Sequence, residues 1–111
     1  MAGFPIGASL LDAIVLCLAA RTGEEGTYGY KITQDVRQVM ELSESALYPV
    51  LRRLLKEGLL STYDRACAGR NRRYYRITEA GRQQIAQYLI QWQQYRDNIE
   101  SVFYRKEQTD G

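Results

Sequence analysis

The chain has 111 residues, of which 45% are apolar and 25% charged, as in ordinary soluble globular domains rather than disordered segments. It has no histidine and only two cysteines, without paired spacing, and shows no clustered carboxylates or activated nucleophile. We therefore expect one domain that is not an enzyme and holds neither a metal nor a cofactor.

Charge is distributed unevenly along the chain. The segment Arg52–Arg82 has nine Lys/Arg and three Asp/Glu, a net +6, whereas the remainder is net −4. This asymmetry indicates one basic surface for a polyanion. The start lacks a basic leader, and the apolar run Ala13–Ala20 is far shorter than the ~20 residues that span a bilayer. We expect a cytoplasmic protein with no membrane partner.

Apolar periodicity predicts two helices in the first part of the chain. The first is capped near Ser9 and ends at about Arg21. It is apolar almost all round, so other elements or a second subunit must cover it. Thr27 is the expected N-cap of a second helix, from Tyr28 to about Met40. The stripe of this second helix is Ile32, Val36, Val39 and Met40.

A third helix follows after only two residues, with Ser43 as its expected cap and Gly58 placed to end it. Its apolar stripe is Leu47, Leu51, Leu54 and Leu55. Two short amphipathic helices joined so tightly predict a helix-turn-helix. Pro49 removes one helical hydrogen bond, and we expect a slight distortion rather than a break. The polar face suits either solvent or a DNA groove and carries Ser45, Tyr48, Arg52, Arg53 and Lys56.

Two strands are predicted next, Leu59–Tyr63 and Arg72–Ile77, with a polar hairpin loop over Arg65–Asn71. Five arginines and no acid lie between Arg65 and Arg76, a density that favours phosphate contact over a merely solvated loop. Three helices followed by a basic hairpin is the order of a winged helix-turn-helix. The expected fold is therefore mainly α with a small β-hairpin, in the α+β class.

Thr78 is the expected cap of a last helix that shows no stop signal before Gln108. Its apolar positions have a heptad spacing that is interrupted at Arg96. They are Ile85, Leu89, Trp92, Ile99 and Phe103. Such a helix implies a partner, most economically a second copy of the chain. The predicted layout is a winged helix-turn-helix region over 1–77, a dimerisation helix over 78–107 and a tail over 108–111, within one compact domain.

Three motifs, within about Leu11–Phe103, resemble the PadR family of bacterial transcriptional regulators. They are Tyr28–Tyr30, Leu42–Leu54 with Glu57–Leu60, and Gly69–Gly81. The single C-terminal helix with Trp92 is similar to the short subfamily, which includes multidrug-binding repressors. The resemblance implies a homodimeric winged-helix repressor on a near-palindromic operator in double-stranded DNA. In that subfamily the last helices and the partner's first helix form the dimer core.

The resemblance also implies a set of DNA contacts. Backbone contacts fall on Tyr28 and Lys31. Contacts at the major groove fall on Ser43, Ser45, Tyr48 and Arg52, and the wing consists of Gly69, Arg70, Arg72 and Arg73. Other residues near these positions have structural alternatives: Arg53 and Arg76 as ion-pair partners, Tyr30 as a packing residue, and one of Tyr74 and Tyr75 as a core residue.

Trp92 has two interpretations. Multidrug-binding relatives stack flat aromatic ligands on tryptophans at the dimer interface, which implies a planar aromatic effector; alternatively, Trp92 is a core residue of the helix seam. Asp12 either faces such a pore or points to solvent, and Arg96 argues against cationic ligands. For the chain as a whole, the alternative is a winged-helix protein-interaction module that reads no DNA, against which the +6 segment argues.

Overall fold

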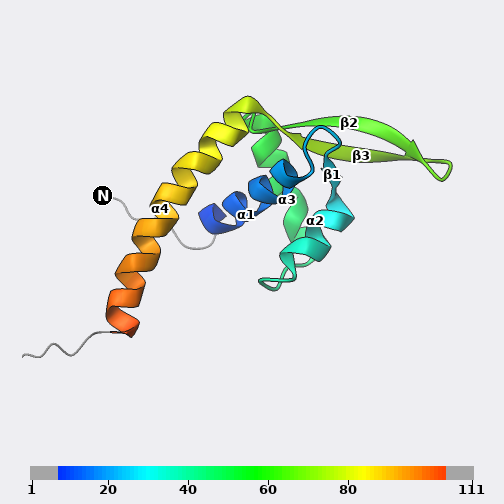
Figure 1. The fold of residues 1–111 in the computed structure, drawn as a ribbon. Coiled ribbons are helices and arrows are strands. Elements are labelled where there is room, and N and C mark those ends of the chain that lie inside the picture. The colour runs from blue at the N-terminus through cyan, green and yellow to red at the C-terminus, as the bar shows by residue number, and fades with distance from the viewer. Residues whose placement is uncertain (1–7, 105–111) are drawn as a thin grey trace, which may run out of the picture.

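The computed structural model describes residues 8–104, which form four helices and a three-stranded antiparallel sheet (Figure 1). The helices are α1 (Ala8–Arg21), α2 (Gly29–Val36), α3 (Glu44–Lys56) and α4 (Glu79–Phe103). The strands are β1 (Thr27–Tyr28), β2 (Leu60–Cys67) and β3 (Arg70–Ile77), in the order β1-β3-β2. The predicted tail over 108–111 and the expected end of the last helix lie outside the described residues.

The core lies between α1, α2 and α3, where the apolar stripes meet. The largest side chains that are fully buried are Val15, Leu16, Ile32, Val36, Leu47, Leu51 and Leu54. Each Leu, Ile or Val removed from water stabilises the fold by about 1.5–3 kcal/mol. The leucine stripe of α3 therefore holds one face of this helix against the core and leaves its other face outside. The helix continues through Pro49 without a break, as expected.

The second helix is shorter than expected. It begins at Gly29 and ends at Val36, and Val39 is 68% exposed rather than part of the buried stripe. Thr27 is not its N-cap, because Thr27 and Tyr28 form β1 and pair with Tyr75 and Tyr74 of β3. The cap position is Tyr28, which makes no side-chain capping bond. Tertiary pairing thus overrides a residue type that suits a helix start.

The hairpin strands are longer and their connection shorter than predicted. β2 and β3 pair from Leu60 with Ile77 to Cys67 with Arg70, so Arg65 and Cys67 lie in a strand rather than in a loop. Only Ala68 and Gly69 connect the strands, at φ 53° and 79°. Two successive positive φ values match a type I′ turn, whose twist suits a hairpin. The hairpin extends from the helical body on the side away from α4 (Figure 1).

The last helix begins at a well-defined junction. The Thr78 hydroxyl accepts from the Gly81 amide at 2.9 Å and donates to the Gly58 carbonyl at 2.7 Å, as a capping residue tied to the end of α3. From there the 25 residues of α4 extend about 37 Å, past the body (Figure 1). Because α4 extends past the body, the radius of gyration of 17.0 Å exceeds the ~13 Å expected for a compact chain of this length.

Candidate nucleic-acid interface

The outer face of α3 presents polar groups at the start of the helix. The Ser43 hydroxyl accepts from the Ala46 amide at 3.1 Å, so the predicted cap is present. The Ser45 hydroxyl lies 3.3 Å from that of Ser43 and is exposed. Arg52, two turns further on, is also exposed. These side chains point away from the leucine core, which leaves them available to a ligand.

Tyr48 is held in place by the elements around it. Its hydroxyl donates to the Glu44 carboxylate at 2.8 Å, and its ring lies so close to Gly29 that a Cβ there would be 2.6 Å from the hydroxyl oxygen. Burial is the main cause that raises the pKa of Tyr48, followed by the hydrogen bond with Glu44. The phenol is therefore neutral at physiological pH, and its oxygen remains able to accept a hydrogen bond from a base.

The structure brings α3 and the hairpin together around Tyr75. Tyr75 is 5% exposed and belongs to the core; burial raises its pKa, while the charges of Arg73 and Arg52 act in the opposite direction. One cation of the wing and one of α3 thus lie near the same phenol. Arg73 also faces Asp64 across the hairpin, at 3.9 Å. Arg70 is exposed beside the turn, and Gly69 adopts the positive φ that the turn requires.

Tyr28 and Lys31 do not join the α3 face directly. Tyr28 lies under the Arg72 guanidinium, which is 4.1 Å from the ring centroid. Lys31 pairs with Asp35 of its own helix at 3.0 Å and lines the groove described below. Tyr30, in contrast, is 59% exposed and does not pack in the core.

Asp12 does not point to solvent, which was one of its two expected placements. It is 5% exposed, and its two oxygens accept from the guanidinium of Arg53 at 2.7 and 2.8 Å. Arg53 is therefore a structural partner that ties α3 to α1. The same carboxylate contributes to the raised pKa of Tyr88 on α4, after burial as the main cause. A charge on an apolar helix is satisfied here by a partner 41 positions away.

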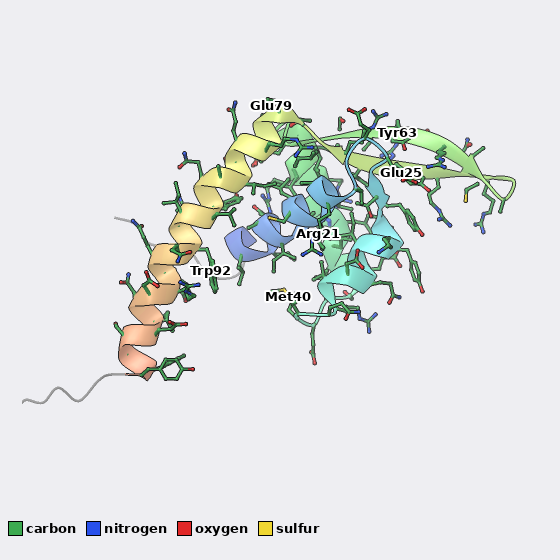
Figure 2. All side chains as sticks on the ribbon, in the orientation of Figure 1. Arg21, Glu25, Met40, Tyr63, Glu79 and Trp92 are labelled. Atoms are coloured by element: carbon green, nitrogen blue, oxygen red, sulfur yellow. The ribbon has the colours of Figure 1, made fainter. Side chains whose placement is uncertain are left out.

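A groove of about 710 Å³ lies between α1, α4 and the end of α2. Trp92 lines it from the middle of α4 (Figure 2), together with Ile14, Cys17 and Leu18 of α1. The predicted seam of α4 divides into two parts. Ile85 packs against the core, whereas Leu89 is 53% and Phe103 is 71% exposed; Trp92 and Ile99 are partly exposed.

One arrangement in the hairpin was not predicted from the sequence. Arg72, Tyr74 and Arg76 alternate along β3 and therefore share the sheet face opposite Tyr75, next to Tyr63 of β2. Tyr75 alone belongs to the core cluster, in agreement with the expectation that one of the two tyrosines is a core residue; Tyr74 is also buried, but on the opposite sheet face. The period-2 alternation of arginine and tyrosine was the available signal. It could not show that β1 supplies a third ring.

A helix-turn-helix whose second helix exposes a polar face, followed by a basic hairpin, defines a winged-helix protein. Residues 15–87 match the family described as "Transcriptional regulator PadR-like family". The chain therefore belongs to the PadR-like family. Members of this family are transcriptional regulators rather than enzymes.

Known relatives agree with this assignment. The crystal structure of smu.1704 from Streptococcus mutans UA159 is 31% identical, with 96% of this chain and 98% of that one covered, at a TM-score of 0.80. The transcriptional regulator Rv3488 of Mycobacterium tuberculosis is 38% identical over 71 residues, 63% of this chain and 66% of the relative. Bacillus subtilis PadR in complex with operator DNA shares the fold, at 24% identity, a TM-score of 0.63 and coverage of 73% of this chain and 47% of that one.

None of the helices within residues 8–104 is long and apolar enough to cross a membrane.

Proposed function

We propose that the chain is a homodimeric repressor that binds a near-palindromic operator in double-stranded DNA, in the cytoplasm. The observation that carries this proposal is the two-sided character of α3. Its leucine face is buried, and its opposite face exposes Ser45, Tyr48 and Arg52. The charges of Arg52 and of Arg73 on the wing both act on Tyr75. A helix of this kind can enter the major groove while the wing arginines contact phosphates.

The test is selection of bound duplexes from a random pool, followed by titration of the selected duplex and an unrelated one at several salt concentrations. Arg70→Ala should weaken binding to both duplexes and lower the salt slope by about one, because one phosphate contact is lost. Tyr48→Ala should weaken binding to the selected duplex more than to the unrelated one. Arg82→Ala removes an exposed cation of α4 and is the matched control, with an unchanged slope. Recovery of no enriched sequence would contradict the proposal.

Dimerisation is proposed to use α4 and the groove beside it. Leu89, Ile90, Val102 and Phe103 are all more than half exposed on this one helix, which is unusual for a monomer in water. If a second copy covers them, the two α3 helices must lie about one DNA turn, ~34 Å, apart to enter successive major grooves, and a two-fold symmetric dimer then requires a near-palindromic operator. The proposed layout is thus a DNA-binding region over 1–77 and a dimerisation helix over 78–107.

Light scattering of Leu89→Glu and Phe103→Glu tests this part. We expect a monomer that retains the helical spectrum, because neither side chain belongs to the buried core. Gln93→Glu adds the same charge at an exposed polar position of α4 and should remain a dimer. A wild-type monomer at micromolar concentration would refute dimerisation.

A planar aromatic effector is proposed to bind in the groove lined by Trp92. The volume of about 710 Å³ is within the range of small-molecule sites, and the lining is mainly apolar. An effector can release DNA only if it prefers one spacing of the two wings. Trp92 is the single tryptophan, so its fluorescence reports on this groove alone. Quenching by a planar aromatic panel together with release of the selected duplex is expected; no quenching by any compound would leave Trp92 as a packing residue.

The second candidate function is a protein-interaction module, favoured only by the general versatility of winged helices. A gel shift with the selected duplex and unlabelled competitor distinguishes the two. If unlabelled selected duplex abolishes the shifted band and an unrelated duplex does not, the chain binds DNA with sequence specificity.

A further inference from the structure

Three tyrosines form a row across all three strands, on the sheet face opposite the core. Tyr28 and Tyr63 both lie directly opposite Tyr74 in the strand register. The Tyr28 and Tyr74 rings meet edge-on, and the Tyr63 and Tyr74 rings stack, with centroids 5.4 Å apart in each pair. Tyr74, in the middle, is only 7% exposed although it faces away from the helices. The row is therefore a rigid aromatic surface at the base of the wing.

Two arginines stand directly opposite each other next to this row. Arg65 of β2 and Arg72 of β3 are register partners. Like charges in such positions repel and destabilise a hairpin. Each guanidinium lies over a different ring: that of Arg72 is 4.1 Å from the centroid of Tyr28, and that of Arg65 is 5.3 Å from the centroid of Tyr74.

The contact with a ring uses the face of a guanidinium and leaves its N–H groups, which lie in the plane, free to donate. Within residues 8–104, the Arg72 side chain makes no hydrogen bond. Arg65 makes a loose ion pair with Glu25 at 3.4 Å, in which both side chains are exposed. This acid lies beside Tyr63, whose hydroxyl donates to the Glu25 carbonyl at 2.5 Å (Figure 2). Both arginines can therefore donate to an incoming anion.

We propose that Arg65 and Arg72 form a phosphate clamp on the wing and that Tyr28 and Tyr74 position it. The repulsion between the two cations is relieved when a DNA phosphate lies between them. Tyr28 then acts on DNA through Arg72 and does not itself touch the backbone. Arg65 is a phosphate contact that lies outside the set of contacts implied by the family resemblance. This inference rests on the proposed DNA binding.

The positioning role is tested with a double-mutant cycle on the full chain, using the selected duplex and an unrelated duplex as probes. Tyr28→Leu removes the ring, Tyr28→Phe keeps it, and Arg72→Ala removes the cation. We expect Tyr28→Phe to bind within about twofold of the wild type and Tyr28→Leu to bind about fivefold more weakly to both duplexes. Because the ring acts through Arg72, Tyr28→Leu combined with Arg72→Ala should bind no more weakly than Arg72→Ala alone.

The clamp itself is tested by the salt dependence of binding. Arg65→Ala and Arg72→Ala should each lower the salt slope by about one. Arg76→Ala is the matched control: Arg76 also lies 4.1 Å from a ring centroid, that of Tyr63, but it faces Ser61 instead of a second cation, so its removal should leave the slope unchanged. Circular dichroism of each variant shows whether the variant is folded, so that a loss of structure is not mistaken for the loss of a phosphate contact.

The outcomes separate this inference from the function on which it rests. Additive losses in the cycle, or equal losses for Tyr28→Phe and Tyr28→Leu, would overturn the positioning role while DNA binding stands. An unchanged slope for Arg65→Ala, or an equally lowered slope for Arg76→Ala, would overturn the clamp. A wild type that binds neither duplex would overturn both the clamp and the proposed function.

Discussion

Removal of either partner of the Asp12–Arg53 pair should have unequal consequences for stability. The Asp12 side chain is 7% exposed, whereas that of Arg53 is 39% exposed. Arg53→Ala therefore leaves a carboxylate buried without a cation, but Asp12→Ala leaves a guanidinium that can turn towards water. The pair joins α1 to α3, so its loss removes a contact that holds α3 against the core.

The magnitudes follow from these exposures. Loss of one partner of a buried pair costs about 3–5 kcal/mol, and the lower end applies to Arg53→Ala because water reaches the edge of the pair. For Asp12→Ala we expect about 1.5 kcal/mol, the worth of hydrogen bonds to a charged group that regains solvent. The double variant removes the stranded charge. It should be destabilised by about 2 kcal/mol less than the two single variants predict together.

The assay is urea unfolding followed by circular dichroism, at one protein concentration because association would shift the midpoint. Lys31→Ala is a control, since it breaks an exposed pair with Asp35 that is worth well under ~1 kcal/mol. The reasoning would be refuted if Asp12→Ala cost as much as Arg53→Ala, or if the double variant were additive. Either result would mean that the Asp12 carboxylate is not buried as the structure has it.

Three further predictions concern the contact between Gly29 and Tyr48, the hairpin turn and the Cys17 thiol. Gly29→Ala should displace Tyr48, whose hydroxyl would lie 2.6 Å from the new Cβ, and should weaken binding to the selected duplex in titration. Ala68→Gly should raise the free energy of unfolding by about 0.5–1 kcal/mol in urea, because glycine adopts the φ of 53° without strain. Burial raises the pKa of the Cys17 thiol, so the folded state favours the neutral form. That contribution is complete below the unfolded-state pKa of about 8.5 and is lost as pH rises through the folded-state pKa. Cys17→Ala should therefore reduce the fall in unfolding free energy between about pH 8 and 10 in a urea series, whereas Cys67→Ala serves as its control.

The elements that could be predicted are those whose signal is local. The caps at Ser43 and Thr78 bond to amides three residues ahead, and the leucine stripe of α3 repeats within four residues, so short windows of sequence contain them. Strand β1 could not be found in this way. Thr27 and Tyr28 have too few neighbours for alternation and become a strand only by pairing with residues near position 75.

The sequence predicts which types of residue form the candidate site, but it predicts only some of the contacts between them. The basic hairpin and the polar face of α3 follow from composition and spacing. An acid on an apolar helix signals a buried partner, but nothing in the sequence selects Arg53 among fifteen cations for Asp12. The two-residue turn was missed because alanine is a poor residue for positive φ, and the polar stretch around it resembles a longer loop.

The tight Ala68–Gly69 turn restricts how the wing can change in length during evolution. Insertion of a single residue into one strand would move every following side chain to the opposite sheet face, so Arg72 would exchange places with its neighbour and lose the ring beneath it. A change of two residues in each strand is the smallest step that keeps both the turn and the faces of a regular ladder. Each such step moves the tip by about 6.8 Å, close to the spacing of successive phosphates along one DNA strand.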